Sequence, residues 1–219
     1  PNSTIWEDVP ALFNYINRAQ SLLQLGQPDS EILLYWPIHD AWGNFYKGKK
    51  FAQFSIHKTD EWLLKGPFYE AANTLIKRGY SFDYISDRFI EKAQFKSGAL
   101  FLPGGHYKTL VVPDTNSMPL ETLKKLIALK EKGASIIFLG LPETVPGFSN
   151  YTLDEKEMSK RLRRSKIEIH DLDQIHLPLI GSGVHAEKLV ETGLKFIRRK
   201  VAEEKVYFIA NHTDQTISG

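Results

Sequence analysis

Short apolar runs alternate along the chain with longer segments of helical periodicity. The clearest run, Ile32 to Trp36, is stopped by Pro37, and similar runs occupy residues 80–85, 107–112, 134–140 and 205–211. A continuous apolar run of this length, bounded by turn residues, is typical of a strand that is buried on both faces of a parallel sheet. We therefore expect strands at these positions and a weaker strand at 167–170.

The segments between these runs carry the signals of helices. Asp8 and Ser117 are candidate N-caps, and a proline follows each of them within the expected first turn. Glycines follow several of the last turns. The expected helices are residues 8–25, 67–78, 118–132, 154–164 and 184–200. This alternation predicts an α/β fold, a flavodoxin-like, doubly wound and mostly parallel sheet with helices on both faces.

Two segments fall outside the alternation. Residues 99–102 and 107–112 flank a turn at Pro103 to Gly105, which favours a hairpin or a short strand before the third core strand. Residues 39–60 are expected to form a long connection rich in aromatic side chains. A loop longer than about 12 to 15 residues is usually functional or covered by another part of the protein.

The net charge and the cysteine count exclude several kinds of partner and of chemical site. The formal net charge is only +2, which predicts neither a nucleic-acid partner nor an acidic membrane surface. The chain has no cysteine, so disulfides, thiolate metal sites and cysteine nucleophiles are excluded. Because the sequence begins at Pro1 and stops directly after a strand-like run, we interpret it as a segment of a longer protein.

Polar and aromatic side chains follow two strands that we expect to be neighbours. His39, Asp40 and Trp42 come after the first strand, and Asp87 and Arg88 come after the second. Ligands of open α/β sheets collect beyond the carboxyl ends of the strands, so these five residues are the predicted substrate-binding residues.

Other interpretations of these residues stay open. Asp40 and Arg88 could form an ion pair that fixes the strand ends, and Asp40 and Asp87 could form the acid/base pair of a glycosidase. The aromatic side chains around Trp42 and Trp62 could stack on a sugar ring or pack against a neighbouring domain.

Cofactor chemistry finds little support in the sequence. Gly181, Gly183 and Ala186 match the dinucleotide-binding fingerprint, but the run before them contains Pro178 and is a poor central strand. The segment after the first strand lacks the glycines that a flavin phosphate requires. The histidines show no metal-ligand spacing. We expect no cofactor and no metal, and keep a nucleotide- or flavin-binding module as an alternative.

Longer phrases of the sequence add a family resemblance. YWPIHDAW, FDYISDRFI and YKTLVVPDTNSMPLETLKKLIALKEKGASIIFLG resemble the region that follows the catalytic barrel in bacterial glycoside hydrolases of family 106, which are α-L-rhamnosidase-like. A looser similarity is to the trimerisation domain of family 42 β-galactosidases. The family 106 resemblance implies a periplasmic or extracellular, multidomain bacterial enzyme whose catalytic glutamates lie in a barrel outside this chain.

The resemblance also implies an organisation for the chain. Residues 1–30 would be a lead-in helix from the barrel, 31–204 the flavodoxin-like domain, and 205–219 the last strand and lead-out to a β-sandwich. The expected role is that of an accessory domain, either non-catalytic or supporting the cleft. Its partners would be the barrel and β-sandwich domains of the same protein and carbohydrate, with self-association left open. The alternative is a self-contained carbohydrate hydrolase that uses Asp40 and Asp87.

Overall fold

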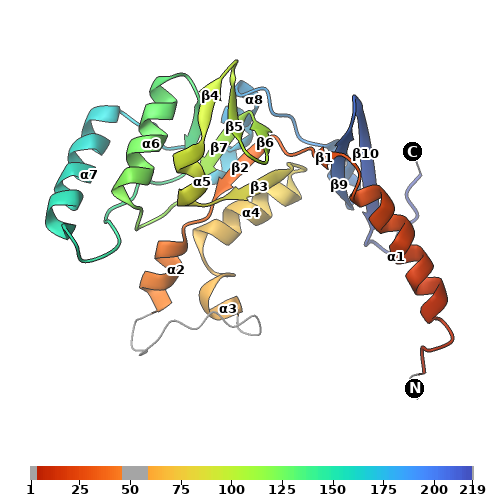
Figure 1. The fold of residues 1–219 in the computed structure, drawn as a ribbon. Coiled ribbons are helices and arrows are strands. Elements are labelled where there is room, and N and C mark those ends of the chain that lie inside the picture. The colour runs from red at the N-terminus through yellow and green to blue at the C-terminus, as the bar shows by residue number, and fades with distance from the viewer. Residues whose placement is uncertain (1–3, 46–58, 219) are drawn as a thin grey trace. The chain divides into compact units, whose positions relative to one another are not determined.

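The computed structural model describes residues 4–45 and 59–218 and forms two compact units (Figure 1). The larger unit runs from Ser30 to Glu187. The smaller unit combines the residues up to Asp29 with those from Lys188 onward. Residues 188–204, which we expected in the larger domain, therefore belong with the amino-terminal segment.

A four-stranded parallel sheet forms the centre of the larger unit. Its strands are β2 (Ile32–Tyr35), β3 (Phe82–Ile85), β7 (Thr109–Val112) and β8 (Ser135–Phe138), and their order is β3-β2-β7-β8. All residues of β2 and β7 are buried, as their continuous apolar runs predict. The weak strand expected at 167–170 is present as a single parallel bridge between Ile169 and Phe138.

Helices pack on both faces of this sheet (Figure 1). On one face, Ile32 and Leu34 of β2 share a core cluster with α4 (Pro67–Lys77) and α8 (His176–Gly181). On the other face, Leu33 and Tyr35 share a cluster with α5 (Asp87–Lys92), α6 (Leu120–Glu131) and α7 (Tyr151–Ser165). Alternate residues of one strand thus feed two cores, which confirms a mixed α/β unit with a buried parallel sheet.

A small antiparallel sheet precedes β7. Strands β4 (Gln94–Lys96), β5 (Ala99–Leu102) and β6 (Gly105–Tyr107) pair in the order β4-β5-β6. The hairpin expected around residues 103–105 is present, but its second arm is β6 rather than residues 107–112, most of which form β7 of the parallel sheet. Strand β4 and helix α5 were not predicted. Ser97 and Gly98 form the β4–β5 turn with φ of 50° and 77°, the positive values that a tight hairpin turn requires.

Two expectations about helix ends and loops are wrong. Residues 39–60 are not one long irregular connection, because α2 (Ile38–Phe45) begins directly after Pro37 and α3 (Thr59–Trp62) follows later. Residues 46–58 of that connection lie outside the described residues. The N-cap position of α6 is Pro119 rather than Ser117.

The smaller unit contains the helix α1 (Val9–Leu23) and an antiparallel sheet. The sheet has the order β1-β9-β10, with β1 (Gln27–Pro28), β9 (Leu194–Val201) and β10 (Glu204–Asn211). α1 buries none of its residues. Within the described residues, no helix is long and apolar enough to cross a membrane.

The helix expected at 184–200 is wrong. A short 3-10 turn at Lys188–Thr192 leads into β9, which pairs along its whole length with β10. Ala202 and Glu203 form the two-residue turn between the strands, and Ala202 has a positive φ of 53°. The hairpin partner lies outside the segment itself, so pairing with β10 overrides the local helical pattern.

Candidate functional site

A cavity of about 370 Å³ opens at the carboxyl edge of the parallel sheet of the larger unit. Its walls come from the segments that follow β2, β7 and β8 and from the turn between α3 and α4. Ligands of open α/β sheets bind at this edge, as the position of the predicted residues implied. The lining residues are Trp36, Pro37, Asp40, Ala41, Trp62, Leu63, Lys65, Gly66, Pro67, Phe68, Asp114, Thr115, Asn116, Leu141 and Glu143.

One wall of the cavity is aromatic. Trp36 follows β2, Phe68 lies in the first turn of α4, and Trp62 ends α3. The rings of Trp36 and Phe68 meet edge to face, with centroids 4.4 Å apart and an interplanar angle of 75°. Such an arrangement is favourable because the positive edge of one ring faces the negative face of the other.

The remaining lining residues include several polar groups on loops. Asp114 and Asn116 lie on the loop after β7, and Glu143 lies on the loop after β8. The two loops are joined, because the backbone N–H of Glu143 donates to the carbonyl of Asn116 at 2.9 Å. The cavity therefore offers carboxylate and amide groups as well as aromatic rings.

Asp40 connects α2 to the loop after β7. Its Oδ2 accepts hydrogen bonds from the hydroxyl of Thr115 at 2.7 Å and from the backbone N–H of Asn116 at 2.9 Å. Its Oδ1 accepts from the backbone N–H of Ser117 at 2.5 Å. Charge-assisted bonds of this kind are among the strong ones. Asp40 therefore fixes one side of the cavity in place.

A second polar cluster surrounds Asp87. Its Oδ1 accepts from the Tyr35 hydroxyl at 2.9 Å and the Thr122 hydroxyl at 2.7 Å, and its Oδ2 lies 3.5 Å from Nε2 of His39. Burial by itself raises the pKa of Asp87, but the hydrogen bonds from His39, Thr122 and Tyr35 outweigh burial and lower the pKa below its ordinary 3.8. Burial and the nearby Asp87 charge raise the pKa of Tyr35, so its hydroxyl stays a donor.

The structure does not bring the five predicted site residues together in one place. Asp40 lines the cavity, whereas His39, Trp42 and Asp87 belong to the second cluster, in which the rings of His39 and Trp42 are 5.3 Å apart. Arg88 is exposed on α5. The expected Asp40–Arg88 pair is wrong, because the Asp40 carboxylate binds the 115–117 segment instead.

Sequence reasoning missed most of the cavity lining. A usable signal was present, because Asp114 and Asn116 follow a predicted strand just as His39 and Asp87 do. Glu143 follows another predicted strand in the same way. Trp36 was assigned to a strand and Phe68 to a helix, and nothing in the sequence showed that they would meet.

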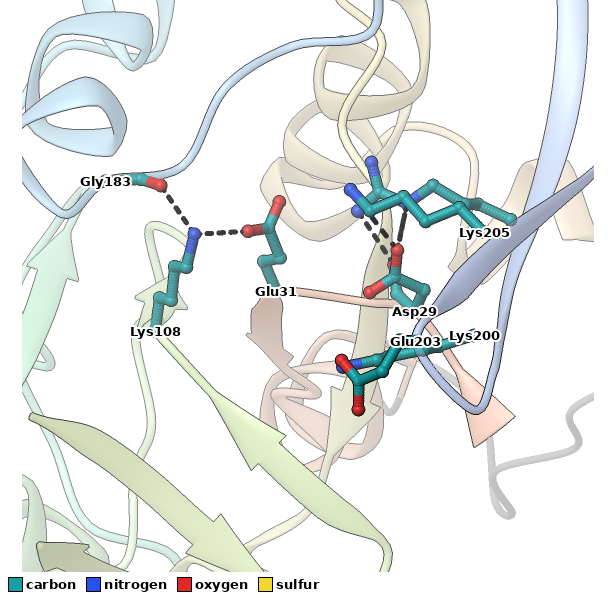
Figure 2. A network of polar contacts seen from close by, with 8 residues as sticks. Asp29, Glu31, Lys108, Gly183, Lys200, Glu203 and Lys205 are labelled. Carbon is teal, nitrogen blue, oxygen red and sulfur yellow. Dashed lines mark hydrogen bonds and ion pairs between the residues drawn. The ribbon is translucent and has the colours of Figure 1, made fainter. Parts of the chain in front are cut away.

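The glycine-rich segment at Gly181 to Gly183 lies at the opposite edge of the sheet. Figure 2 shows the Lys108 ammonium between the Glu31 carboxylate and the carbonyl of Gly183, at 2.5 Å and 2.7 Å. Glu31 and Lys108 directly precede β2 and β7, so this is the amino edge. Gly181 is the last residue of helix α8, whereas the first glycine of a dinucleotide fingerprint follows a strand. The context of a nucleotide site is therefore absent here.

Within residues 4–45 and 59–218, no three histidine or acidic side chains gather as a metal site requires.

Residues 2–218 match the family model described as alpha-L-rhamnosidase, glycoside hydrolase family 106. A curated protein of Formosa agariphila, named "Putative beta-glucuronidase", is 26% identical over 217 residues. The match covers 95% of this chain but 16% of that relative. The family match extends over nearly the whole described chain, so the chain belongs to the α-L-rhamnosidase family of glycoside hydrolases, family 106.

Proposed function

We propose that this chain is a non-catalytic domain of a multidomain glycoside hydrolase and that the cavity at its carboxyl edge binds part of a saccharide. The observation that carries the proposal is the pairing of an aromatic wall, including Trp36 and Trp62, with polar groups on Asp114, Asn116 and Glu143. The C–H faces of a pyranose pack on aromatic rings as other apolar surfaces do. Carboxylate and amide groups can pair with sugar hydroxyls.

The five residues predicted from the sequence have two roles in this proposal. Asp40 holds the 115–117 segment so that Asn116 faces the cavity. His39, Trp42, Asp87 and Arg88 would form an outer contact surface beside it. Trp42 is 44% exposed and could contact a sugar or a neighbouring domain.

The contacts that Asp40 and Asp87 make within the domain support a non-catalytic role. A catalytic carboxylate must exchange a proton with the substrate or attack its anomeric carbon. Both oxygens of Asp40 already accept hydrogen bonds from the 115–117 segment. Asp87 likewise has three partners, Tyr35, Thr122 and His39. Such contacts are expected of carboxylates that hold a structure together.

The order of the strands supports a flavodoxin-like fold for the larger unit. When the four core strands are numbered by their order in the chain, their order across the sheet is 2-1-3-4. The parallel bridge between Phe138 and Ile169 adds a fifth position beside β8. This is the order of flavodoxin-like, doubly wound sheets. We assign the larger unit to that fold on this ground.

The smaller unit supports a role within a longer protein. The chain spans 16% of the length of its Formosa relative. α1 buries none of its residues, and Leu12, Phe13 and Tyr15 are each about half exposed. Exposed apolar side chains on this scale mark surfaces that another protein surface covers. We infer that the neighbouring catalytic and β-sandwich domains of the same protein cover this surface. The protein would act in the periplasm or outside a bacterial cell.

The substrate class follows from the family and from the relative. The family description points to α-L-rhamnosides, and the name of the relative points to β-glucuronides. The alternative function is a self-contained hydrolase that uses Asp40 and Asp87 as its acid/base pair.

One experiment separates the two functions. The chain and the longer protein that carries it are assayed side by side on nitrophenyl α-L-rhamnoside and nitrophenyl β-D-glucuronide. We expect only the longer protein to release nitrophenol, and Trp62→Ala in that protein to raise KM more than it lowers kcat. Hydrolysis by the chain alone, lost in Asp87→Asn, would overturn the non-catalytic assignment.

A further inference from the structure

An aromatic row leads from the cavity to the edge strand of the sheet. We define it as Trp36, Phe68, Tyr84 and Phe82. Ring centroids are 4.4 Å apart between Trp36 and Phe68, 5.5 Å between Phe68 and Tyr84, and 5.5 Å between Tyr84 and Phe82. Trp36 and Phe68 also line the cavity, so the row is continuous with its aromatic wall.

The far half of the row is accessible. Tyr84 is 62% exposed, although it lies in a strand of the central sheet. β3 is the edge strand of the four-stranded sheet, and within the described residues no strand pairs with its outer side. Phe82 and Tyr84 point to the same face because side chains alternate along a strand. Solvent therefore reaches Tyr84 most freely, while Phe82 beside it is half-buried against the core cluster of this face.

The backbone of the edge strand adds polar groups beside the rings. The carbonyl of Ile85 accepts from the backbone N–H of Trp36 at 2.9 Å, so the backbone groups of Ile85 face β2. Backbone groups alternate in direction along a strand, so those of Tyr84 face outward. Buried or ligand-covered backbone groups need a partner, and sugar hydroxyls can both donate and accept.

We propose that the aromatic row continues the saccharide site beyond the cavity, so that the domain binds an oligosaccharide chain rather than a single sugar. The inference rests on the proposed function of the cavity. Trp36 lines the cavity at one end of the row and the exposed Tyr84 ring lies towards the other, so the row offers ring contacts at two separate places. The outer backbone edge of β3 adds hydrogen-bonding groups beside Tyr84. An oligosaccharide has apolar sugar faces and a rim of hydroxyl groups, so it matches both the aromatic rings and the backbone groups.

The test compares a short and a long ligand on variants of the full 219-residue chain. L-rhamnose and a longer rhamnose-containing oligosaccharide are titrated calorimetrically. We expect Tyr84→Ala to weaken oligosaccharide binding roughly three- to tenfold, in the range of one aromatic stacking contact, and to leave L-rhamnose binding unchanged. Trp62→Ala should weaken both ligands, because Trp62 lines the cavity.

Controls separate the possible failures. Tyr84→Phe keeps the ring and should retain most of the affinity, and Phe148→Ala removes a fully exposed ring outside the row and should change nothing. If Trp62→Ala weakens both ligands and Tyr84→Ala weakens neither, the aromatic row is not part of the site and the cavity proposal stands. If the unmodified chain binds neither ligand, the cavity proposal fails and the row fails with it.

Discussion

The carboxylate of Asp40 accepts a hydrogen bond from the hydroxyl of Thr115 at 2.7 Å, which joins α2 to the loop after β7. The same carboxylate accepts the backbone N–H groups of Asn116 and Ser117. One side chain from the helix that follows the first core strand thus sets the position of the loop after the third core strand. The polar lining of the cavity depends on this contact.

Removing the Asp40 carboxylate should loosen the loop after β7. Asp40→Ala leaves two backbone N–H groups and one hydroxyl without their acceptor, and we expect the free energy of unfolding to fall by about 2 to 4 kcal/mol. Chemical denaturation measures the change. Asp40→Asn keeps one acceptor oxygen and should lose roughly half as much. An unchanged midpoint for Asp40→Ala would contradict the role assigned to this residue.

Gly140 and Asp114 define a second constraint on the cavity. A Cβ atom on Gly140 would lie 1.8 Å from Oδ1 of Asp114 and 2.9 Å from its Cα, so the Asp114 backbone would have to move. We expect Gly140→Ala to cost roughly 1 to 3 kcal/mol of stability and to weaken saccharide binding. The readouts are thermal unfolding and titration with L-rhamnose.

Gly181→Ala is the matched control for this substitution. No atom outside its own helix lies within 4 Å of a Cβ atom on Gly181, which ends α8. We expect stability equal to or slightly above that of the unmodified chain, because alanine lowers the entropy of the unfolded state. If both substitutions lower stability equally, contact with Asp114 is not the cause of the loss in Gly140→Ala.

The lowered pKa of Asp87 predicts a loss of stability in acid. A carboxyl whose pKa is lower when folded contributes stability above its unfolded pKa and loses that contribution as pH falls through the folded value. The free energy of unfolding should therefore decline as pH drops below the ordinary 3.8. Denaturation curves across this range should show a smaller decline for Asp87→Asn.

Thr122→Val provides an independent check on the cause. It removes one of the hydroxyls that donate to Asp87 and keeps the side-chain shape. The pKa of Asp87, followed by carboxyl NMR titration, should rise towards its ordinary value. A pKa that does not move would mean that Thr122 does not stabilise the charged form.

The smaller unit depends on a buried ion pair between Asp29 and Arg198. Nε of Arg198 lies 2.7 Å from Oδ2 of Asp29, and the Arg198 side chain is 4% exposed. Breaking a buried pair by removing one member costs about 3 to 5 kcal/mol. We expect Arg198→Ala to release the β9–β10 hairpin, measured as faster amide hydrogen exchange in Leu194–Val201.

Lys205 offers the comparison for Arg198. Its ammonium lies 3.6 Å from the same Asp29 oxygen (Figure 2), but half of its side chain is exposed. Exposed ion pairs contribute about 0 to 1 kcal/mol, so Lys205→Ala should leave exchange in β9 nearly unchanged. If both substitutions act equally, burial of the Arg198 pair is not what stabilises the hairpin.

The sequence by itself determined the core of the larger unit. β2, β7 and β8 are continuous apolar runs, and a run of that kind is stable only where both faces are buried, so local composition and sheet position agree. The helices α4 and α6 followed from periodicity and from a proline at the start and a glycine after the end of each. The charged segment of α7 was also predicted to be helical. Family membership also came from the order of residues, through phrases such as YWPIHDAW.

Tertiary structure alone decided the partners of the polar residues. The sequence placed Asp40 and Asp87 at the correct edge but not the partners of their carboxylates, because a carboxylate pairs with the nearest donors in space. Those donors are Thr115 to Ser117 for Asp40, and Tyr35 and Thr122 for Asp87.

Tertiary structure also decided the fold of residues 188–201. Residues 194–201 carry enough helical character to predict a helix, yet they pair with β10, and a strand is stabilised by cross-strand contacts that no local pattern records. The aromatic row has the same origin. Trp36 follows β2, Phe68 lies on α4 and Tyr84 lies on β3, and only the packing of α4 against the edge of the sheet brings their rings together.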